Sequence, residues 1–505
     1  MGHAVRVLKK KAPRGAVNAE GYSAYERDWR EEYLKMLLTN LISDIFYASE
    51  KELGEESLGL HHFAADEDPE FMAKALLYAR TEGYMRLQPI IGAAVLSLAS
   101  PTWFARIFDR VIVTVADLVE FTLALESLGR GQGGRVVKKF AAARLERLTE
   151  YEVLKYSGSG RGYSLKDLLR VYHPKPRNIA AQALYRYVAR KKGYRSPDPH
   201  FLPRITALER LKKIDLEYYS DEGSKLIRSG GLPWNAVTGA ISKMTPELWA
   251  ALLPDMTLFS LLRHLNVMIR NGVISEHEFM PEIAERFTDP EAIRRAKILP
   301  FRFASAWNEV GVPWVKEVLE RAVDLSAETL PEIPGRTAVL LDISSSMSGR
   351  PLLAASVLAL SILKRAGGNG MIRLFNHEDC LFQTRRGESI PTAASRIKAS
   401  GGTDTGVSIR AMEAEKAWCD QLVIVTDEQQ NTGPGFCLDL KRYRRRVNPE
   451  ARAFIINMAP CAHGMTPVED ENTFYCYGWS DHAISFIAHT LQGYGGLIER
   501  VLALG

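Results

Sequence analysis

The spacing of apolar residues along the chain separates two kinds of structure. Between about Trp29 and Val323, apolar residues recur at i, i+3, i+4 and i+7, as in DPEFMAKALLYARTEGYM, and this spacing predicts amphipathic helices. Glycine and proline clusters interrupt the pattern at 129–134, 157–162 and 173–178, where helices are expected to end. A long series of helices with almost no alternating strands is typical of a HEAT-like repeat array, although the sequence has no strict repeat period.

The pattern changes at PEIPGR, residues 331–336. After this point short, strongly apolar runs alternate with helical stretches. The runs at 337–342, 371–375, 421–427, 451–457 and 472–479 are expected to be strands, and helices are expected at 351–366, 404–418, 436–446 and 481–491. Such alternation predicts βαβ units, a mostly parallel sheet and helices on both of its faces.

We therefore predict a multidomain chain. Residues 1–15 form a basic flexible tail, residues 16–330 an α-helical domain, and residues 331–505 an α/β doubly wound domain. The composition, with 46% hydrophobic and 25% charged residues, excludes the disordered and fibrous classes. No apolar run is long enough to span a bilayer, and the chain does not start with an apolar signal segment, so we expect a cytoplasmic protein with no membrane partner.

The cysteines do not indicate a zinc site or a disulfide framework. Their number is odd, they form no CxxC pair, and no pair of histidines completes a zinc pattern. We expect them to be reduced and mostly buried. They are Cys380, Cys419, Cys437, Cys461 and Cys476.

The net charge of +5 is small, but the basic residues are unevenly distributed. Residues 129–179 contain 12 basic and 4 acidic residues, a local excess of eight, which is the kind of patch that can neutralise phosphates. Arg130 lies in a glycine-rich loop, and Arg135, Lys138 and Lys139 follow directly after it. Exposed backbone N–H groups of that loop could also meet phosphates.

A second basic turn follows in the same segment. On a helix that begins with Ser164 as its N-cap, Lys166, Arg170 and His173 are spaced at i, i+4 and i+7 and would share one face. Such faces give sequence-tolerant affinity for nucleic acids through counterion release. The alternative is a solvated basic face without a partner. Tyrosines between the cations could stack on bases or simply pack in the core: Tyr151, Tyr156, Tyr163 and Tyr172.

Three separate segments place oxygen ligands at the expected ends of apolar strands. Asp342 ends the first strand, and Ser344 and Ser346 follow it in a tight loop. Thr403 lies in the glycine-rich turn GGTDT, and Asp427 ends a further strand. In doubly wound sheets, ligands bind beyond the carboxyl ends of the strands. Carboxylates and hydroxyls are hard donors, so we predict one divalent cation, Mg²⁺ or a similar ion.

Two other interpretations of these residues are possible. Asp342, Ser344 and Asp427 are also residue types that favour helix N-caps, but their order along the chain favours a metal site. A hydrolytic metal centre would need an activated nucleophile and a positioned base. Glu428 and His377 are the nearest candidates; neither has an identifiable partner, and we expect both to be solvated loop residues. The ion is therefore predicted to serve binding rather than catalysis.

The order DxSxS, GGTDT and a later strand-ending aspartate resembles the metal-ion-dependent adhesion site of von Willebrand factor A domains. In that family an Asp and two Ser of DxSxS, a Thr and a second Asp surround the ion, and an acidic group of a partner often completes the ligands. The resemblance implies these roles for Asp342, Ser344, Ser346, Thr403 and Asp427, with Thr405 as the alternative to Thr403.

The first part of the chain resembles the TROVE domain shared by telomerase-associated, Ro and vault proteins, and specifically the bacterial Ro proteins. The likeness rests on the basic segment, YSLKDLLRVYHPKP at 163–176, GLPWNAV at 231–237 and residues 241–272. In Ro proteins, helical repeats close into a ring bridged by the metal-site domain. Small Y-type RNAs bind its outer surface, and single-stranded 3′ ends of misfolded RNAs enter its hole. Bacterial relatives work with polynucleotide phosphorylase, a 3′-to-5′ exoribonuclease.

The resemblance implies a monomeric, noncatalytic RNA chaperone or adaptor in RNA quality control and degradation. It would bind Y-like RNA and misfolded RNA with a single-stranded 3′ end. The alternative is a metal-dependent protein-interaction scaffold that does not bind RNA, and a metal-dependent nuclease is a third possibility. The basic segment favours the first hypothesis over the second, because a pure scaffold does not need it.

Overall fold

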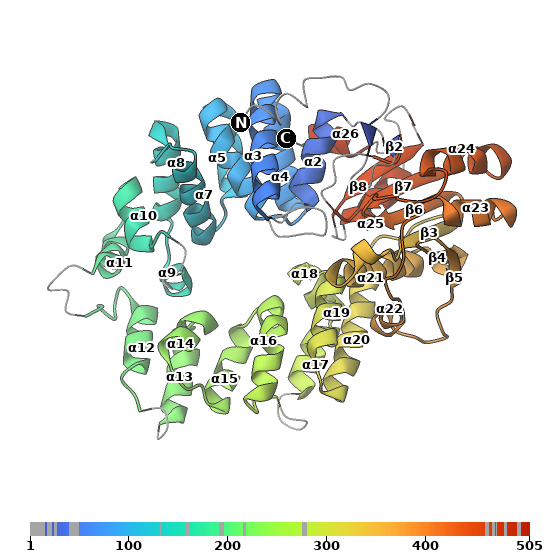
Figure 1. The fold of residues 1–505 in the computed structure, drawn as a ribbon. Helices are drawn as coiled ribbons and strands as arrows, with labels where there is room; N and C mark the ends of the chain where they lie inside the picture. Colours follow the sequence, from blue (N-terminus) through green and yellow to red (C-terminus); the bar gives the residue numbers. More distant parts are fainter. Residues whose placement is uncertain are drawn as a thin grey trace. The chain divides into compact units, whose positions relative to one another are not determined.

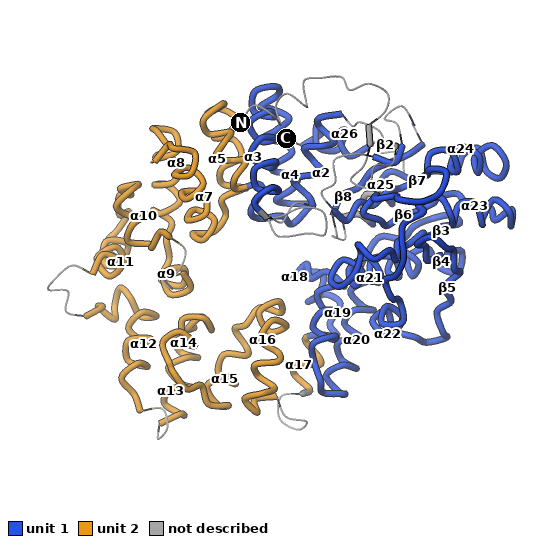
Figure 2. The backbone as a smooth tube through the Cα atoms, viewed as in Figure 1, with its two compact units in different colours: residues 1–89, 287–505 blue, residues 90–286 orange. Residues whose placement is uncertain are grey.

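The fold comes from a computed structural model, in which contacts separate two compact units (Figure 2). Unit 1 comprises residues 1–89 and 287–505, and unit 2 comprises residues 90–286. The structure describes residues 16–17, 23–24, 28–39, 50–131, 133–156, 162–190, 196–215, 219–274, 280–459, 464–466, 470, 472–478, 482–491 and 496–504. The predicted flexible tail at residues 1–15 lies outside the described residues.

A six-stranded sheet in the order β5-β4-β3-β6-β7-β8 forms the centre of unit 1 (Figure 1). All neighbouring strands are parallel except β5, which pairs antiparallel with β4. Every residue of β3 and β6 is buried, as expected for central parallel strands. The strands are β3 (Thr337–Asp342), β4 (Gly370–Phe375), β5 (Asp379–Phe382), β6 (Gln421–Thr426), β7 (Arg452–Asn457) and β8 (Thr473–Tyr477).

Helices connect these strands, as the alternating pattern predicted. The predicted helices correspond to α21 (Arg350–Arg365), α23 (Val407–Ala414), α24 (Phe436–Arg446) and α25 (His482–Leu491). Helix α23 begins later than expected because the glycine-rich turn continues to Gly406, its N-cap, and it ends at Ala414, before the predicted end at residue 418. The sequence did not predict β5, α22 (Ile390–Ser395), α26 (Leu497–Leu502) or the 3₁₀ turns η2 (Ser345–Met347) and η3 (Gly367–Asn369).

Unit 1 also contains helices from both ends of the predicted helical domain. Helix α2 packs against β8, α4 packs against α26, and α19 and α20 pack against α21. The predicted domain boundary at residue 330 falls between α20 and β3, and it stays a prediction. The elements of unit 1 that come from the predicted helical domain include two short strands that pair antiparallel, β1 (Ala16–Val17) and β2 (Ser23–Ala24). The helices are α2 (Trp29–Thr39), α3 (Glu50–Glu67), α4 (Pro69–Thr81), α18 (Pro290–Ala296), α19 (Pro300–Glu309) and α20 (Pro313–Glu328).

Unit 2 is built from consecutive helices. Its first and last helices, α5 (Leu87–Ala99) and α17 (Met280–Thr288), each begin or end in unit 1. The others are α6 (Pro101–Val111), α7 (Val115–Ser127), α8 (Gly134–Glu146), α9 (Glu150–Tyr156), α10 (Leu165–Tyr172), α11 (Ile179–Ala189), α12 (Pro203–Leu211), α13 (Ser220–Gly230), α14 (Trp234–Ala240), α15 (Pro246–Leu252), η1 (Leu253–Asp255) and α16 (Leu258–Arg270). Pro254 separates α15 from α16, because proline cannot continue a helix interior.

The predicted fold class, a helical array followed by a doubly wound α/β domain, is confirmed.

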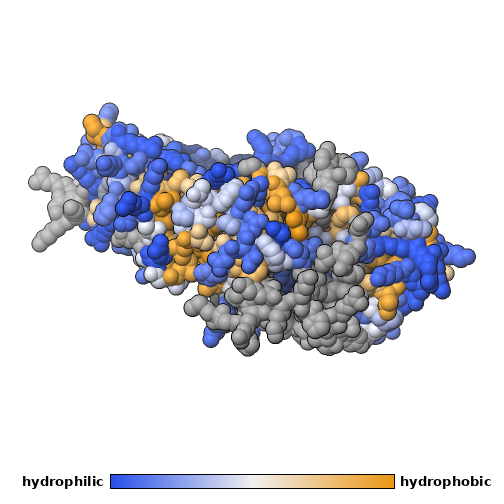
Figure 3. Space-filling view, turned by 90° about the horizontal axis from the view of Figure 1, so that it is seen from above, coloured by the Kyte–Doolittle hydropathy of each residue, from blue (hydrophilic) through white to orange (hydrophobic). Residues whose placement is uncertain are grey.

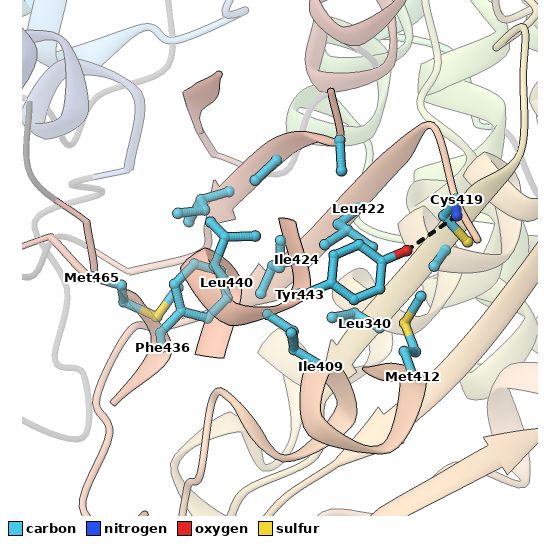
Figure 4. Packing of buried hydrophobic residues seen from close by; sticks show 14 of the residues in the cluster. Leu340, Ile409, Met412, Cys419, Leu422, Ile424, Phe436, Leu440, Tyr443 and Met465 are labelled. Atoms are coloured by element: carbon cyan, nitrogen blue, oxygen red, sulfur yellow. Dashed lines mark hydrogen bonds between the residues drawn. The ribbon is translucent and has the colours of Figure 1, made fainter. Parts of the chain in front are cut away.

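The α/β domain has a continuous apolar core between the sheet and its helices (Figure 4). Leu340 of β3 and Ile424 of β6 are fully buried against α24. The buried Tyr443 hydroxyl accepts a hydrogen bond from the Cys419 backbone N–H at 3.1 Å and donates one to the Ala417 carbonyl at 2.7 Å, so its polar group is satisfied. This packing holds α24 against the sheet to which β3 and β6 belong.

Most of the described cysteines are buried free thiols, as the sequence predicted. Figure 3 shows one face of the molecule, on which hydrophilic residues predominate and apolar patches lie between them. No helix among the described residues has the length and apolar character needed to cross a membrane. Cys419, Cys437 and Cys476 are buried free thiols and Cys380 is exposed; Cys461 lies outside the part of the chain that the structure describes.

Candidate functional site

The carboxyl end of β3 positions the first candidate metal ligand. β3 lies between β4 and β6, and the three strands are parallel, so the loops that follow them leave the sheet at the same edge. Asp342 ends β3 and is fully buried. Its Oδ1 accepts a hydrogen bond from the Ser344 backbone N–H at 2.8 Å, and its Oδ2 accepts one from the Thr426 hydroxyl at 2.6 Å. These two bonds hold the carboxylate between the loops after β3 and β6.

Four of the five predicted metal ligands lie together. The hydroxyls of Ser344 and Ser346 are 3.1 Å apart. Ser346 also hydrogen-bonds the carboxylate of Asp427, which directly follows β6 and is buried. Asp427 in turn is near enough to Asp342 for its charge to act on that carboxylate. The loops after β3 and β6 therefore bring two carboxylates and two hydroxyls to one place.

The third loop joins the other two through its backbone. The Ser345 N–H donates to the Gly401 carbonyl at 3.1 Å, and Gly401 adopts a left-handed φ of 79° that suits glycine. The Thr403 N–H donates to the side chain of Asn431 at 2.8 Å, and the Thr403 carbonyl accepts from the Asn431 N–H at 3.0 Å. Thr403 is therefore held between the loops that carry Ser345 and Asn431.

The two candidate threonines differ in what their hydroxyls do. The Thr405 hydroxyl donates to the Gln430 side-chain carbonyl at 2.7 Å, so it is already used inside the fold. The Thr403 hydroxyl has no hydrogen-bond partner among the described residues, although the residue is buried. The Thr403 hydroxyl is therefore available to contact a bound cation, whereas the Thr405 hydroxyl is occupied. This difference favours Thr403 over Thr405 as the ligand.

The electrostatics of the site favour a cation. Burial, followed by the charge of Asp427, raises the pKa of Asp342 above its usual range. Burial also raises the pKa of Asp427, while the hydrogen bond from Ser346 opposes that rise. Within the described part of the chain neither carboxylate has an ion-pair partner, so two buried acids face each other without a countercharge. An all-oxygen donor set of carboxylates and hydroxyls fits Mg²⁺.

Glu428 was expected to be a solvated loop residue, and this expectation is wrong. Its side chain is buried and its carboxylate accepts hydrogen bonds from the Asn457 side-chain amide and from the Met465 backbone N–H. Its φ of 61° is unusual for a residue with a side chain, and the surrounding bonds hold it there. Glu428 therefore fastens the loop after β6 to β7. His377 is exposed, as expected.

In unit 2, the predicted glycine-rich loop leads into α8. Gly133 is the N-cap of this helix, with a left-handed φ of 73°, and a Cβ there would lie 2.8 Å from Val137. No side chain caps the first turn of α8, so its backbone N–H groups remain open to an anion. Arg130, Arg135 and Lys139 are exposed and Lys138 is half-buried. The first cationic turn is thus placed at a helix N-terminus, where the helix dipole also favours negative charge.

The second predicted cationic turn, with Lys166, Arg170 and His173, is only partly helical. Helix α10 begins with the expected N-cap Ser164, which forms a capping box with Asp167. Lys166 and Arg170 lie on this helix, but Arg170 is 3.8 Å from Asp167, which offsets part of its charge. His173 does not share the helical face, because the helix ends at Tyr172 and His173 takes a left-handed φ of 48°. The proline that follows it disfavours helical backbone at this position.

Ion pairs inside unit 2 use several of the other basic residues of the segment. Arg144 is buried and pairs with Glu152, Arg147 pairs with Asp109 at 3.1 Å, and Arg177 pairs with Glu146 at 3.4 Å. In contrast, five cations form no ion pair with a described residue: Arg130, Arg135, Lys138, Lys139 and Lys166. Helices α8 and α10 pack against each other (Figure 1), so these charges lie on adjoining elements.

The tyrosines of the segment serve different purposes. Tyr172 is buried, and its hydroxyl hydrogen-bonds Thr122 at 2.9 Å, so it is a packing residue. Tyr151 is 38% exposed. The Lys155 ammonium lies 5.7 Å from the ring centre of Tyr151 and 5.6 Å from that of Tyr156. Tyr151 thus combines an accessible ring with a neighbouring positive charge.

Comparison with known proteins agrees with this architecture. Residues 237–330 match the TROVE domain. The chain is 24% identical over 371 residues to the RNA-binding protein RO60 of Deinococcus radiodurans, a match that covers 67% of each protein. It is 29% identical over 137 residues to an uncharacterised protein of Synechocystis, of which it spans 33%. The crystal structure of the Deinococcus radiodurans RO (RSR) protein superposes with a TM-score of 0.69 at 18% identity, covering 92% of this chain and all of that one.

The segment that matches the TROVE domain lies in the helical part of the chain, and the mixed-sheet domain follows it. The chain is similar to bacterial Ro proteins in sequence and in fold, and the resemblance predicted from its motifs is confirmed.

Proposed function

We propose that this chain is a noncatalytic RNA-binding protein of the cytoplasm. It holds small Y-like noncoding RNA and misfolded RNA that carries a single-stranded 3′ end. It acts as a chaperone or as an adaptor in RNA quality control, in which the degrading partner is a 3′-to-5′ exoribonuclease such as polynucleotide phosphorylase. The name of the Deinococcus relative, an RNA-binding protein, supports the first part of this proposal.

One observation carries the proposal. Five cations on or beside α8 and α10 form no ion pair with the residues that the structure describes, whereas Arg144, Arg147 and Arg177 of the same segment do. The open N-terminus of α8 lies in the same cluster. Unpaired cations around exposed N–H groups bind phosphates and give affinity that tolerates many sequences.

We also propose that the Asp342 site holds one Mg²⁺ ion, in the manner of the metal-ion-dependent adhesion site. Asp342, Ser344, Ser346, Thr403 and Asp427 would hold it. When bound, the ion neutralises the two carboxylates and can accept an acidic group of a partner. The support is the buried, all-oxygen donor set without a countercharge described above.

The protein is expected not to hydrolyse RNA. A hydrolytic centre needs a positioned base next to the metal, and the carboxylate of Glu428, which follows Asp427 in the chain, is held by Asn457 and Met465. A 5′-labelled RNA with a 3′ tail should stay full length with the purified protein and Mg²⁺ or Mn²⁺. RNA shortening that disappears in Asp427→Ala would contradict the noncatalytic proposal.

The experiment that tests the proposed function compares two RNAs with the same duplex. One ends in a single-stranded 3′ tail and the other is blunt. The tailed RNA is expected to bind at least about fivefold more tightly, because each base that stacks on a protein side chain contributes roughly 1–3 kcal/mol. Equal affinity would contradict recognition of the 3′ end. Failure of the folded protein to bind either RNA would contradict the proposed function and favour the protein-interaction scaffold.

A further inference from the structure

A small pocket in unit 2 is lined in part by the GLPWNAV segment, residues 231–237. This segment follows the cationic turns of α8 and α10 by about sixty residues in the sequence. Its volume is about 220 Å³, which is below the roughly 300–1,000 Å³ of pockets for larger ligands. Its lining includes Tyr151 of α9, Arg204 of α12, Trp234 of α14 and Asp255 of η1. Aromatic rings, a guanidinium and a carboxylate thus surround a space suited to a single planar group.

The backbone of the GLPWNAV segment holds Arg204, the positively charged residue of the pocket. Arg204 donates from Nη1 to the Gly231 carbonyl at 2.5 Å. Gly231 has a left-handed φ of 52°, and a Cβ there would lie 2.6 Å from the same nitrogen. Only glycine permits this close approach. The Arg204 guanidinium also lies 5.9 Å from the ring centre of Tyr151, so the arginine is held between the turn and the tyrosine.

The aromatic wall is held in place from behind. The rings of Trp234 and His264 have their centres 4.0 Å apart. His264 is in turn fixed by a hydrogen bond of 2.7 Å between Nδ1 and the Ser260 carbonyl. A ring that is already positioned loses little freedom when it stacks on a ligand, which favours binding.

The remaining wall offers hydrogen-bond acceptors. Asp255 is exposed and has no hydrogen-bond or ion-pair partner among the described residues. A carboxylate accepts hydrogen bonds at two oxygens and donates none. Among the nucleobases, guanine presents two N–H donors side by side, at N1 and at the exocyclic N2, and these match the two carboxylate oxygens.

We propose that this pocket binds one guanine base of a single RNA strand. The base stacks on Tyr151 and Trp234, its N1–H and N2–H groups donate to Asp255, and Arg204 and Lys155 neutralise the neighbouring phosphates. The inference rests on the proposed RNA-binding function and adds to it a base preference, which phosphate contacts alone cannot give.

The test uses short single-stranded RNAs that differ in one base. Uridine nonamers with one central guanosine, inosine or adenosine are titrated against the full chain and followed by fluorescence anisotropy. Inosine keeps the N1–H but lacks the exocyclic amine. Wild type is expected to bind the guanosine nonamer about tenfold more tightly than the inosine nonamer, which lacks one hydrogen bond to a charged group. The adenosine nonamer lacks both of these donors and is expected to bind no better than the inosine nonamer.

Three variants separate the pocket from general RNA binding. Asp255→Asn should abolish the guanosine preference while leaving affinity for the adenosine nonamer unchanged, whereas Asp221→Asn, an exposed acid on α13, should leave the preference intact. Tyr151→Leu should weaken all three nonamers by roughly fivefold or more. If wild type binds RNA without a guanosine preference, or if Asp255→Asn keeps it, the pocket proposal is wrong and the proposed function stands. If wild type binds no RNA, both fail.

Discussion

The Asp342→Ala variant is expected to lose saturable Mg²⁺ binding, with affinity at least about a hundredfold below that of wild type. Loss of a residue that only supports a ligand already costs roughly 10- to 100-fold in metal affinity, and Asp342 would be a ligand itself. Its carboxylate is buried, fixed by Ser344 and Thr426, and close to Asp427. Isothermal titration with Mg²⁺ measures the loss directly.

Thermal stability provides a second measure of the same change. Mg²⁺ should raise the unfolding temperature of wild type as its concentration exceeds the dissociation constant, and should not raise that of Asp342→Ala. Without metal, the change relieves the repulsion between two buried acids but also removes the acceptor of the Ser344 N–H and the Thr426 hydroxyl. The rise in unfolding temperature on adding Mg²⁺ is therefore the quantity to compare. Glu378→Ala, an exposed acid in the loop after β4, is the matched control and should bind Mg²⁺ normally. Undiminished Mg²⁺ binding by a folded Asp342→Ala variant would contradict the proposed site.

RNA binding is expected to be almost unchanged in Asp342→Ala. The metal site lies in unit 1, whereas the cationic turns of α8 and α10 lie in unit 2. A collapse of RNA affinity in the folded variant would mean that the two activities are not separate.

The α/β half of the fold could be predicted because central parallel strands are continuous apolar runs. The sequence places β3 correctly, and β4, β6, β7 and β8 to within one or two residues at each end. Strand β5 is a short edge strand that depends on pairing with β4, and its DCLF sequence has no alternating pattern. Helices α22 and α26 have six residues each, too few for a helical period to be visible.

The site was predictable where its chemistry is local and not where it depends on tertiary contacts. The order of Asp342, Ser344 and Asp427 along the chain was sufficient to indicate converging oxygen ligands. The burial of Glu428 depends on Asn457 and Met465, which lie on later segments, so no local pattern reveals it.

The basic segment shows the same limit for charge. A count of basic residues treats all of them as available, but Arg147 finds Asp109 in a preceding helix and Arg177 finds Glu146. The end of α10 before His173 was available from the sequence, because the residue before a proline disfavours helical backbone. The distribution of charge along the chain was therefore sufficient to predict the basic segment. Which of its cations are free of ion pairs depends on tertiary contacts and could not be predicted.

Replacing Arg135, Lys138 and Lys139 together with alanine should weaken binding to many RNAs with little change in sequence preference. All three lie on α8 without an acidic partner among the described residues. Each lost phosphate contact reduces the log–log slope of affinity against salt by roughly 0.7 for single strands and 0.9 for duplexes, so the triple variant should lose about 2.1–2.7. Alanine favours helix, so α8 should remain folded.

The matched control removes cations that are already paired. Arg147→Ala with Arg177→Ala changes two exposed arginines of the same unit that form ion pairs with Asp109 and Glu146. Because these side chains are used within the fold, the control should change the slope by much less than its two lost charges would suggest.

RNA affinity measured across a series of salt concentrations, for wild type, the triple variant and this control, tests the central claim most directly. The account predicts a steep slope for wild type, a slope smaller by about 2.1–2.7 for the triple variant and almost no change for the control. A folded triple variant with the slope of wild type would show that the cations of α8 are merely solvated, and would contradict the assignment of this surface to RNA.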